Sequence, residues 1–256
     1  MIETDSFTSE TSSLLADRVS VRRYSDKPVP AALVDAVLQA AFRAPTSSNI
    51  QAYSVVVVRD QERLKLLSAV TGNQKHVAAT PVFLAFCADL TRMQAAMEKN
   101  GKSIEANNLE LGLVSSIDAA LVGMATSLVA ESFGLKGVMI GAVRNDPTEV
   151  ARILGLPKRV FCVFGMCLGW PDEAPVQKPR MAQQAMVHYE TYGNHGADGD
   201  PVAMLEAYDR DLYAHYTAMQ KLSAEDSWTA EIAKKFSPQP RAGLRAALRE
   251  RGFDFL

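Results

Sequence analysis

The segment from Asn108 to Phe133 constrains the fold of this 256-residue chain most strongly, because it predicts a long helix that is apolar on nearly every side. One stripe of the helix carries Leu113, Ile117, Leu121, Met124 and Leu128, and the other face carries Leu111, Val114, Ala120, Ala125 and Val129. Gly134 ends the pattern. A helix without a polar face has to be buried, either in a core or at a subunit interface.

Runs of β-branched and apolar residues predict strands before and after this helix. They lie at Tyr53–Val58, Val82–Ala88, Val138–Ile140 and Val160–Leu168. Helical spacing of apolar residues predicts helices over Pro30–Arg43, through Leu64 and Leu67, and from a start near Pro147. Strands interleaved with helices favour an α+β or α/β layer architecture.

The two ends of the chain differ from the middle in composition. Residues 1–13 are rich in Ser, Thr, Asp and Glu, which predicts a flexible leader. After about residue 195 a loop through Asn194–Pro201 precedes three predicted helices, at 202–222, 228–235 and 241–251. We therefore expect a core domain at 14–195 and a helical C-terminal arm at 196–256 that packs on the core or on a partner.

Global composition excludes several classes of function. Apolar residues make up 48% of the chain and charged residues 22%, as in ordinary globular enzymes. The net charge of −2 gives no electrostatic reason to expect a nucleic-acid partner. The N-terminus lacks the basic-then-apolar order of a signal peptide. The longest apolar stretches also fall below the ~20 residues of a membrane helix. We expect a cytoplasmic protein without membrane contact.

The chain has three cysteines, Cys87, Cys162 and Cys167. A small and odd number of cysteines predicts no disulfide framework. We expect Cys162 and Cys167 to be buried and, being five residues apart on one strand, to point to opposite faces.

The motifs that announce common catalytic machinery are missing. No G-x-G-x-x-G follows a predicted strand, and there is neither a P-loop nor a G-x-S-x-G turn. The four histidines have no metal-binding spacing, so we expect no metal site. The chemistry is therefore expected to belong to a bound organic cofactor.

Two short basic segments indicate what such a cofactor carries. Arg18, Ser20 and Arg22 alternate on an extended segment, while Lys178 and Arg180 flank a proline. Guanidinium groups fork onto phosphate oxygens and lysine adds a point charge. Each segment alone also fits a solvated surface, but both in one chain favour a phosphate-bearing ligand.

Three polar or glycine-containing loops lie between the basic segments. Thr46–Gln51 and Gly72–His76 fit hydrogen bonding to a ring edge or phosphate, or plain turn chemistry. Gly137–Asn145 leaves a strand through Gly141, which either lets main-chain amides approach a planar ligand or only permits a tight strand end.

These segments together resemble the FMN-dependent nitroreductase family. The resemblance rests on Arg18–Pro30, Ala44–Gln51, Thr71–Ala78, Gly137–Asn145, Phe164–Pro171 and Lys178–Arg180, in the same order and spacing over roughly residues 14–235. Within the family they are most similar to oxygen-insensitive NADPH nitroreductases and NADPH–flavin oxidoreductases.

The resemblance implies an α+β, nitroreductase-like fold with a mainly antiparallel sheet flanked by helices. It also implies a homodimer with FMN at the interface, a C-terminal arm that embraces the partner, and Asn108–Phe133 as the interface helix. The FMN-binding residues that it implies, some of them from the second subunit, are Arg18, Val19, Ser20, Arg22, Ser47, Ser48, Asn49, Gln51, Gln74, Ile140, Gly141, Ala142, Lys178 and Arg180.

The implied activity is ping-pong hydride transfer from NADPH or NADH through flavin N5 to nitroaromatics, quinones or related acceptors, with no catalytic side chain. Lys75 and Lys221 are candidates for contacts with the nicotinamide or substrate. Two alternatives stay open: a flavin reductase that releases reduced FMN, and a non-catalytic flavin-binding protein.

Two positions depart from the family pattern. Val19 stands where relatives commonly carry a basic residue, and the stretch Met219–Trp228 has Lys221 as its one basic residue where NADPH-preferring relatives carry arginines. Charge-assisted hydrogen bonds contribute about 1.5–3 kcal/mol each, so we expect a reduced preference for NADPH.

Overall fold

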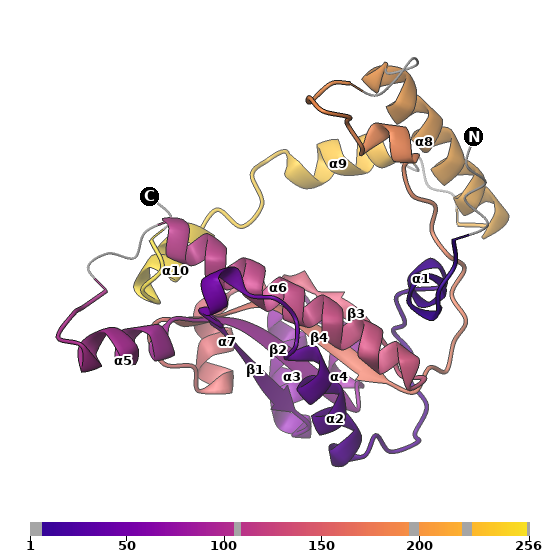
Figure 1. Ribbon diagram of the computed structural model, residues 1–256. Helices are drawn as coiled ribbons and strands as arrows, with labels where there is room; N and C mark the ends of the chain where they lie inside the picture. Colours follow the sequence, from indigo (N-terminus) through magenta and orange to yellow (C-terminus); the bar gives the residue numbers. More distant parts are fainter. Residues whose placement is uncertain (1–6, 105–108, 195–199, 222–226, 255–256) are drawn as a thin grey trace. The chain divides into compact units, whose positions relative to one another are not determined.

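The computed structural model describes residues 7–104, 109–194, 200–221 and 227–254. It divides into two compact units, one formed by Met1–Pro175 with Arg241–Leu256 and the other by Val176–Pro240 (Figure 1). The last helix, α10 (Leu244–Glu250), belongs to the larger unit because Leu248 and the following Phe253 are buried in its core. This helix therefore lies in the larger unit, although the sequence predicts it as part of an arm that begins at residue 196.

A four-stranded sheet forms the centre of the larger unit. Its order is β1-β2-β4-β3, and every neighbouring pair is antiparallel. The strands are β1 (Tyr53–Val58), β2 (Val82–Asp89), β3 (Lys136–Ile140) and β4 (Val160–Gly169). The predicted α+β class with a mainly antiparallel central sheet is confirmed. β2 is buried at every position, which explains its unbroken run of apolar residues.

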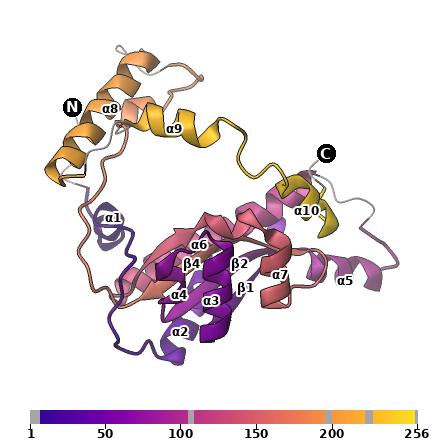
Figure 2. The same cartoon turned by 180° about the vertical axis from the view of Figure 1, so that it is seen from behind.

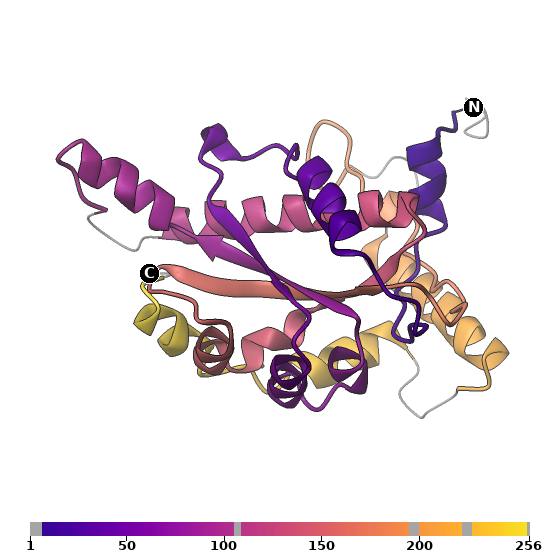
Figure 3. The same ribbon diagram turned by 90° about the horizontal axis from the view of Figure 1, so that it is seen from below.

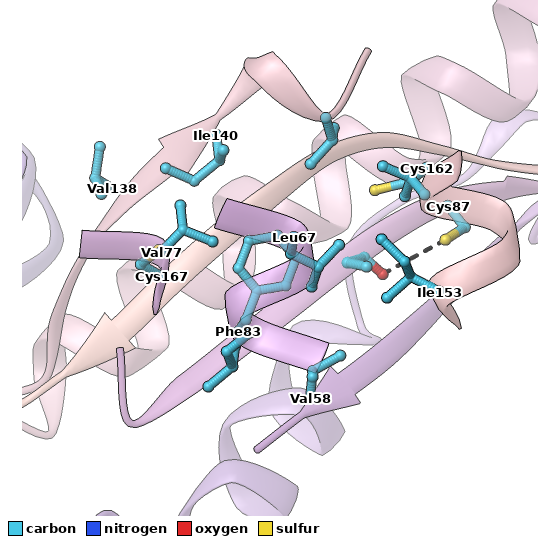
Figure 4. Close-up of a cluster of buried hydrophobic side chains, with 14 of the residues drawn as sticks. Val58, Leu67, Val77, Phe83, Cys87, Val138, Ile140, Ile153, Cys162 and Cys167 are labelled. Carbon is cyan, nitrogen blue, oxygen red and sulfur yellow. Dashed lines mark hydrogen bonds between the residues drawn. The ribbon is translucent and has the colours of Figure 1, made fainter. Parts of the chain in front are cut away.

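Helices cover both faces of this sheet, as Figures 2 and 3 show from two directions. One face packs against α2 (Ala31–Ala41) and α6 (Leu109–Ser132). The other packs against α3 (Gln61–Val70), α4 (Lys75–Ala78) and α7 (Pro147–Leu154). Alternation along β2 serves the two cores, because Leu84 and Phe86 face α6 while Phe83 and Cys87 face α3 and α7 (Figure 4).

The prediction that Cys162 and Cys167 point to opposite faces is wrong. Both lie in the core under α3, α4 and α7 (Figure 4). The register between β2 and β4 shifts between Phe86 and Cys87, which leaves Val163 as an extra residue on β4. A bulge of this kind resets the alternation of side chains, so residues five apart return to the same face.

The long helix α6 is buried on one side and exposed on the other. Its buried side packs so closely on the sheet that a Cβ added at Gly123 would lie 2.4 Å from the ring of Phe164. Its exposed side carries the apolar stripe, defined here as Leu109, Leu113, Ile117, Leu121 and Met124. The helix was predicted to be apolar on nearly every side. One apolar side packs in the core, and the other is exposed in the single chain.

In length and hydropathy α6 also fits a membrane-crossing helix, with a mean hydropathy of 1.7 over its most apolar window. However, 44% of that window is buried within the protein, and Ser115 and Asp118 on it are fully buried. A buried aspartate and serine are typical of a helix that packs against a protein core. The sequence predicted no apolar stretch of membrane-spanning length, whereas α6 reaches that length and composition.

Besides α4, two short helices lie in regions where the sequence predicted none. α1 (Glu10–Ala16) begins inside the predicted flexible leader, because Ser9 and Ser12 form a reciprocal capping box at its start. α5 (Thr91–Lys99) follows β2, and the carboxylate of Asp89 accepts a hydrogen bond from the N–H of Thr91 at its start.

The smaller unit is built on α8 (Pro201–Ala218) and α9 (Trp228–Phe236). These helices pack through the rings of Tyr208 and Trp228, whose centroids are 6.2 Å apart, and the N–H of Thr229 donates to Asp209 at 3.1 Å.

Candidate functional site

The basic segment Arg18–Arg22 is held along the edge of the sheet. The N–H of Val21 donates to the carbonyl of Gly137 on β3 at 3.0 Å, and the side chain of Val21 is fully buried. A Cβ at Gly137 would lie 2.3 Å from the carbonyl oxygen of Cys167, so glycine is required for the close approach of β3 to β4 here. Arg22 is exposed while Val21 is buried, as the predicted alternation requires, but Arg18, Val19 and Ser20 are all half-buried.

Glu173 fixes this segment from the other side. Its Oε1 accepts hydrogen bonds from the N–H groups of Arg22 at 2.6 Å and Arg23 at 3.1 Å. Tyr24 adds a bridge to Pro171, and its hydroxyl donates to the carbonyl of Val21 at 2.8 Å. Burial raises the pKa of Tyr24, so the hydroxyl stays protonated as a donor. The main chain is thereby anchored, and the guanidinium of Arg22 remains at the surface.

His76 lies close to the same segment, two residues after the candidate Gln74. Burial lowers its pKa, the nearby Arg22 lowers the pKa further, and Glu173 opposes both. Its Nε2 atom is buried without a hydrogen-bond partner among the residues that the structure describes. Gln74 precedes α4, and its carbonyl accepts a hydrogen bond from Ser68 at 2.9 Å. Lys75 is exposed.

The candidate loop at residues 46–52 has an unusual backbone. Ser48, Asn49 and Gln51 have φ values of 47°, 57° and 53°, in the left-handed region. Such a conformation costs about 1–2 kcal/mol for a residue with a Cβ, although asparagine tolerates it better. Backbone strain of this kind clusters at functional sites, where the surrounding structure maintains it.

Two charged residues hold this loop, and sequence reasoning missed both. Asp118 on α6 accepts from the N–H groups of Ser47 at 2.9 Å and Ala52 at 3.0 Å. Arg92 on α5 donates to the carbonyl of Gln51 at 3.0 Å and also to that of Tyr53. An aspartate in the middle of a mostly apolar helix was the one sequence signal for the first contact, because such a charge needs a polar partner.

A cavity of about 350 Å³ opens beside this loop and the end of α2. Phe42, Thr46, Asn49 and Gln51 line it. A neighbouring cavity of about 250 Å³ is lined by Phe42, Gln51 and Arg92 among others. The polar side chains predicted to reach a ligand therefore border open space rather than the core.

The third predicted segment, Ile140–Ala142, lies where β3 ends. Ile140 is buried and pairs with Gly165 on β4, and Gly141 begins the short helix η3 (Gly141–Asn145). Arg144 lies beside Gly141 and donates to the carbonyl of Val163. Burial lowers the pKa of Arg144, and the nearby Arg241 lowers it further.

The remaining predicted residues belong to the smaller unit. Lys178 is exposed and its Nζ donates to the hydroxyl of Tyr216 at 2.5 Å. Arg180 is exposed and contacts the carbonyls of Lys178 and Pro179 at 3.4 and 3.3 Å. Lys221 is exposed after α8, and residues 222–226 of the predicted nicotinamide loop lie outside the described residues.

Within the larger unit, the basic segment and the strained loop lie at opposite ends of the sheet. Gly137 contacts the basic segment and pairs with Leu168 near the end of β4. The loop leads into β1 at Tyr53, which pairs with Ala88 on β2. Ala88 in turn pairs with Phe161 near the start of β4. Six residue steps of β2, from Val82 to Ala88, separate these levels by roughly 20 Å. Along α6, Asp118 likewise lies roughly 21 Å from the end that leads into β3.

The residues at these two places match the chemistry of a flavin mononucleotide. Arg18, Ser20 and Arg22 carry the charge and hydroxyl that a phosphate would need. The orphaned Nε2 of His76 beside Arg22 is a buried polar atom that a ligand oxygen can satisfy. The exposed polar side chains at 47–51 would supply donors and acceptors for a ring edge.

Comparison with known proteins tests the resemblance to the nitroreductase family. Residues 15–170 match the nitroreductase family, and residues 178–256 match the C-terminal domain of the nitroreductase family. The chain belongs to the nitroreductase family. The resemblance found in the sequence is thereby confirmed.

Individual relatives extend over nearly the whole chain. It is 35% identical over 241 residues to an FMN reductase [NAD(P)H] of Bacillus subtilis, covering 93% of this chain and 96% of the relative. It is 34% identical over 247 residues to an oxygen-insensitive NADPH nitroreductase of Salmonella typhimurium, covering 96% and 98%.

Solved structures give the same result. The fold matches the hypothetical oxidoreductase YcnD from Bacillus subtilis with a TM-score of 0.91 and 34% identity, over 97% of this chain and 99% of that one. It matches the NADPH:FMN oxidoreductase from Vibrio harveyi complexed with NAD+ with a TM-score of 0.84 and 30% identity, over 95% and 98%.

Proposed function

We propose that this nitroreductase-family protein is an FMN-dependent NAD(P)H oxidoreductase that reduces nitroaromatics, quinones or related small acceptors. The observation that carries the proposal is the full-length match to relatives named FMN reductase and NADPH nitroreductase. The anchored basic segment and the strained polar loop, in the order and spacing of that family, support it from the residues themselves.

The redox chemistry would come from bound FMN, which takes hydride from NAD(P)H and passes electrons to the next occupant of the same site. The protein supplies binding and position. Arg18, Ser20 and Arg22, with Lys178 and Arg180, would hold the phosphate. Ser47–Asn49, Gln51 and Gln74 would bind the ring edges, and the main chain at 140–142 would border the reacting face. Lys75 would add positive charge near the ring, and no side chain is needed as acid or base for hydride transfer.

We further propose a homodimer in which each site uses residues of both chains. Two observations support it. One protomer leaves the basic segment and the strained loop roughly 20 Å apart, so a ligand that contacts both needs the loop of a second copy. The apolar stripe of α6 also leaves five large side chains 36–53% exposed, which is typical of a subunit interface. Of the predicted arm at 196–256, the part before Arg241, which belongs to the smaller unit, would embrace the partner.

Reconstitution followed by reduction tests the proposal. Apoprotein is titrated with FMN, and the flavin absorbance is then followed without oxygen while NADPH or NADH is added. Saturable binding and bleaching of the flavin band support an oxidoreductase. Bound flavin that neither donor reduces would indicate the non-catalytic flavin-binding alternative.

A flavin reductase that releases reduced FMN is the second candidate, and the names of two Bacillus subtilis relatives at 35% identity favour it. Steady-state turnover with increasing free FMN separates the two. Saturable acceleration by free FMN, with parallel double-reciprocal lines, identifies FMN as a substrate that shares the site. Unchanged turnover identifies a nitro or quinone reductase.

We also propose that the preference for NADPH over NADH is weak, because Lys221 is the one basic residue between Met219 and Trp228. The ratio of kcat/KM for the two donors measures this. A ratio of about ten or less agrees with the loss of arginine contacts, and a hundredfold preference for NADPH contradicts it. The location we propose is the cytoplasm, where NAD(P)H is available as the electron donor.

A further inference from the structure

Asp118 is a buried carboxylate that both ends of the strained loop contact. Its side chain is 0% exposed. One oxygen accepts the N–H of Ser47 at 2.9 Å, and the other accepts the N–H of Ala52 at 3.0 Å. The two donors lie 71 and 66 residues away in sequence, so the contact joins the core helix to a distant segment.

The four residues between these donors include Ser48, Asn49 and Gln51 in the left-handed conformation. Inside this span the N–H of Ile50 donates to the carbonyl of Ser47 at 2.8 Å, which continues the turn from the first anchored residue. Arg92 contacts the loop through carbonyl groups rather than N–H groups. Asp118 is thus the charged acceptor that fixes where the loop begins and where it ends.

We infer that Asp118 is a positioning residue for the cofactor loop: it keeps Ser48, Asn49 and Gln51 in their strained conformation before any ligand is bound. A carboxylate suits this role because it has two acceptor oxygens and hydrogen bonds to a charged acceptor are stronger than those to a neutral one. The inference rests on the proposed function, since these loop residues are the ones that would contact FMN.

The first test is Asp118→Asn, which keeps the size of the side chain. The substitution removes the charge and leaves one acceptor oxygen instead of two. Hydrogen exchange of peptides covering residues 46–52 is measured by mass spectrometry without FMN. We expect exchange about ten- to hundredfold faster than in the unsubstituted protein. Glu131→Gln is the matched control, because Glu131 is a buried carboxylate of the same helix that pairs with Lys136 at 3.2 Å and does not contact the loop.

A second pair of variants tests the contact from the loop side, without changing the core helix. Ser47→Pro removes the N–H that donates to Asp118, while Ser47→Ala removes the hydroxyl and keeps the N–H. Proline fits here because Ser47 is the first residue of a short helix and the preceding Thr46 is extended, with ψ of 151°. The dissociation constant for FMN is measured by flavin fluorescence, and we expect it to be about tenfold higher for Ser47→Pro than for Ser47→Ala.

The outcomes separate this inference from the proposed function. If the unsubstituted protein does not bind FMN, the proposed function fails, but exchange of the apoprotein loop still tests Asp118. Asp118 does not position the loop if the loop amides of Asp118→Asn exchange at the same rate as in the unsubstituted protein. The same holds if Glu131→Gln accelerates exchange of the loop amides equally. Equal FMN affinity of Ser47→Pro and Ser47→Ala would overturn the inference even if Asp118→Asn failed to fold.

Discussion

Ile117→Ser tests the apolar stripe of α6 as the subunit interface. Ile117 is 53% exposed in the single chain, so about half of its surface remains to be buried by a partner. Complete burial of an isoleucine side chain contributes about 1.5–3 kcal/mol, which leaves about 1 kcal/mol for that half. A twofold interface uses each residue twice, so serine should cost about 2 kcal/mol per dimer. The dimer dissociation constant is then expected to rise about 30-fold.

Sedimentation velocity over a dilution series, with fluorescence detection, measures this constant. Leu66→Ser is the matched control, because Leu66 is 44% exposed but lies on α3, outside the stripe. FMN affinity should fall at concentrations where the Ile117→Ser protein becomes monomeric, since each site uses both chains. The reasoning is refuted if Ile117→Ser dissociates at the same concentration as the unsubstituted protein, or if Leu66→Ser weakens the dimer equally.

Three further substitutions test the account of stability. Burial acts to raise the pKa of Asp89, but hydrogen bonds from Ser54 and Thr91 and the charge of Arg92 lower it overall. Its contribution is therefore complete above the unfolded pKa of about 3.9 and lost as pH falls through the lower folded pKa. Asp89→Asn should therefore make the free energy of unfolding depend less on pH in that window, as measured by circular dichroism. Burial lowers the pKa of His76, so the neutral form stabilises the fold above about pH 6.5 and loses this effect as pH falls. His76→Gln should reduce the loss of stability below that pH in urea titrations, and an unchanged pH slope would contradict the assignment. Phe83→Ala should cost about 3–5 kcal/mol in the same titrations because Phe83 is fully buried, and a cost below 1 kcal/mol would mean that this core is loosely packed.

Local sequence patterns were sufficient to predict most of the fold. The β-branched run at Tyr53–Val58 became β1 with the same bounds, although this edge strand is only half-buried and Val57 is exposed. The apolar pattern around Ile117 gave α6 its length within the described residues. α1 was missed because its apolar content is low and a serine capping box defines its start.

The bulge at Val163 and the anchors of the candidate site were not predictable from local patterns. A bulge depends on the register between two strands, and no feature of β4 alone reveals that register. The contacts of Asp118 with Ser47, and of Glu173 with Arg22, join residues that are 71 and 151 positions apart. The sequence predicted the residues expected to face a ligand, and the structure adds the residues that hold them in place.

The most direct test of the central claim is the visible spectrum of FMN-reconstituted protein, followed without oxygen as NADPH and then NADH is added. The account predicts saturable FMN binding and bleaching of the flavin band by at least one donor. It also predicts that Arg22→Gln weakens FMN binding by about ten- to hundredfold through the lost phosphate contact. A protein that binds no FMN, or binds it with the same affinity after Arg22→Gln, would contradict the site described here.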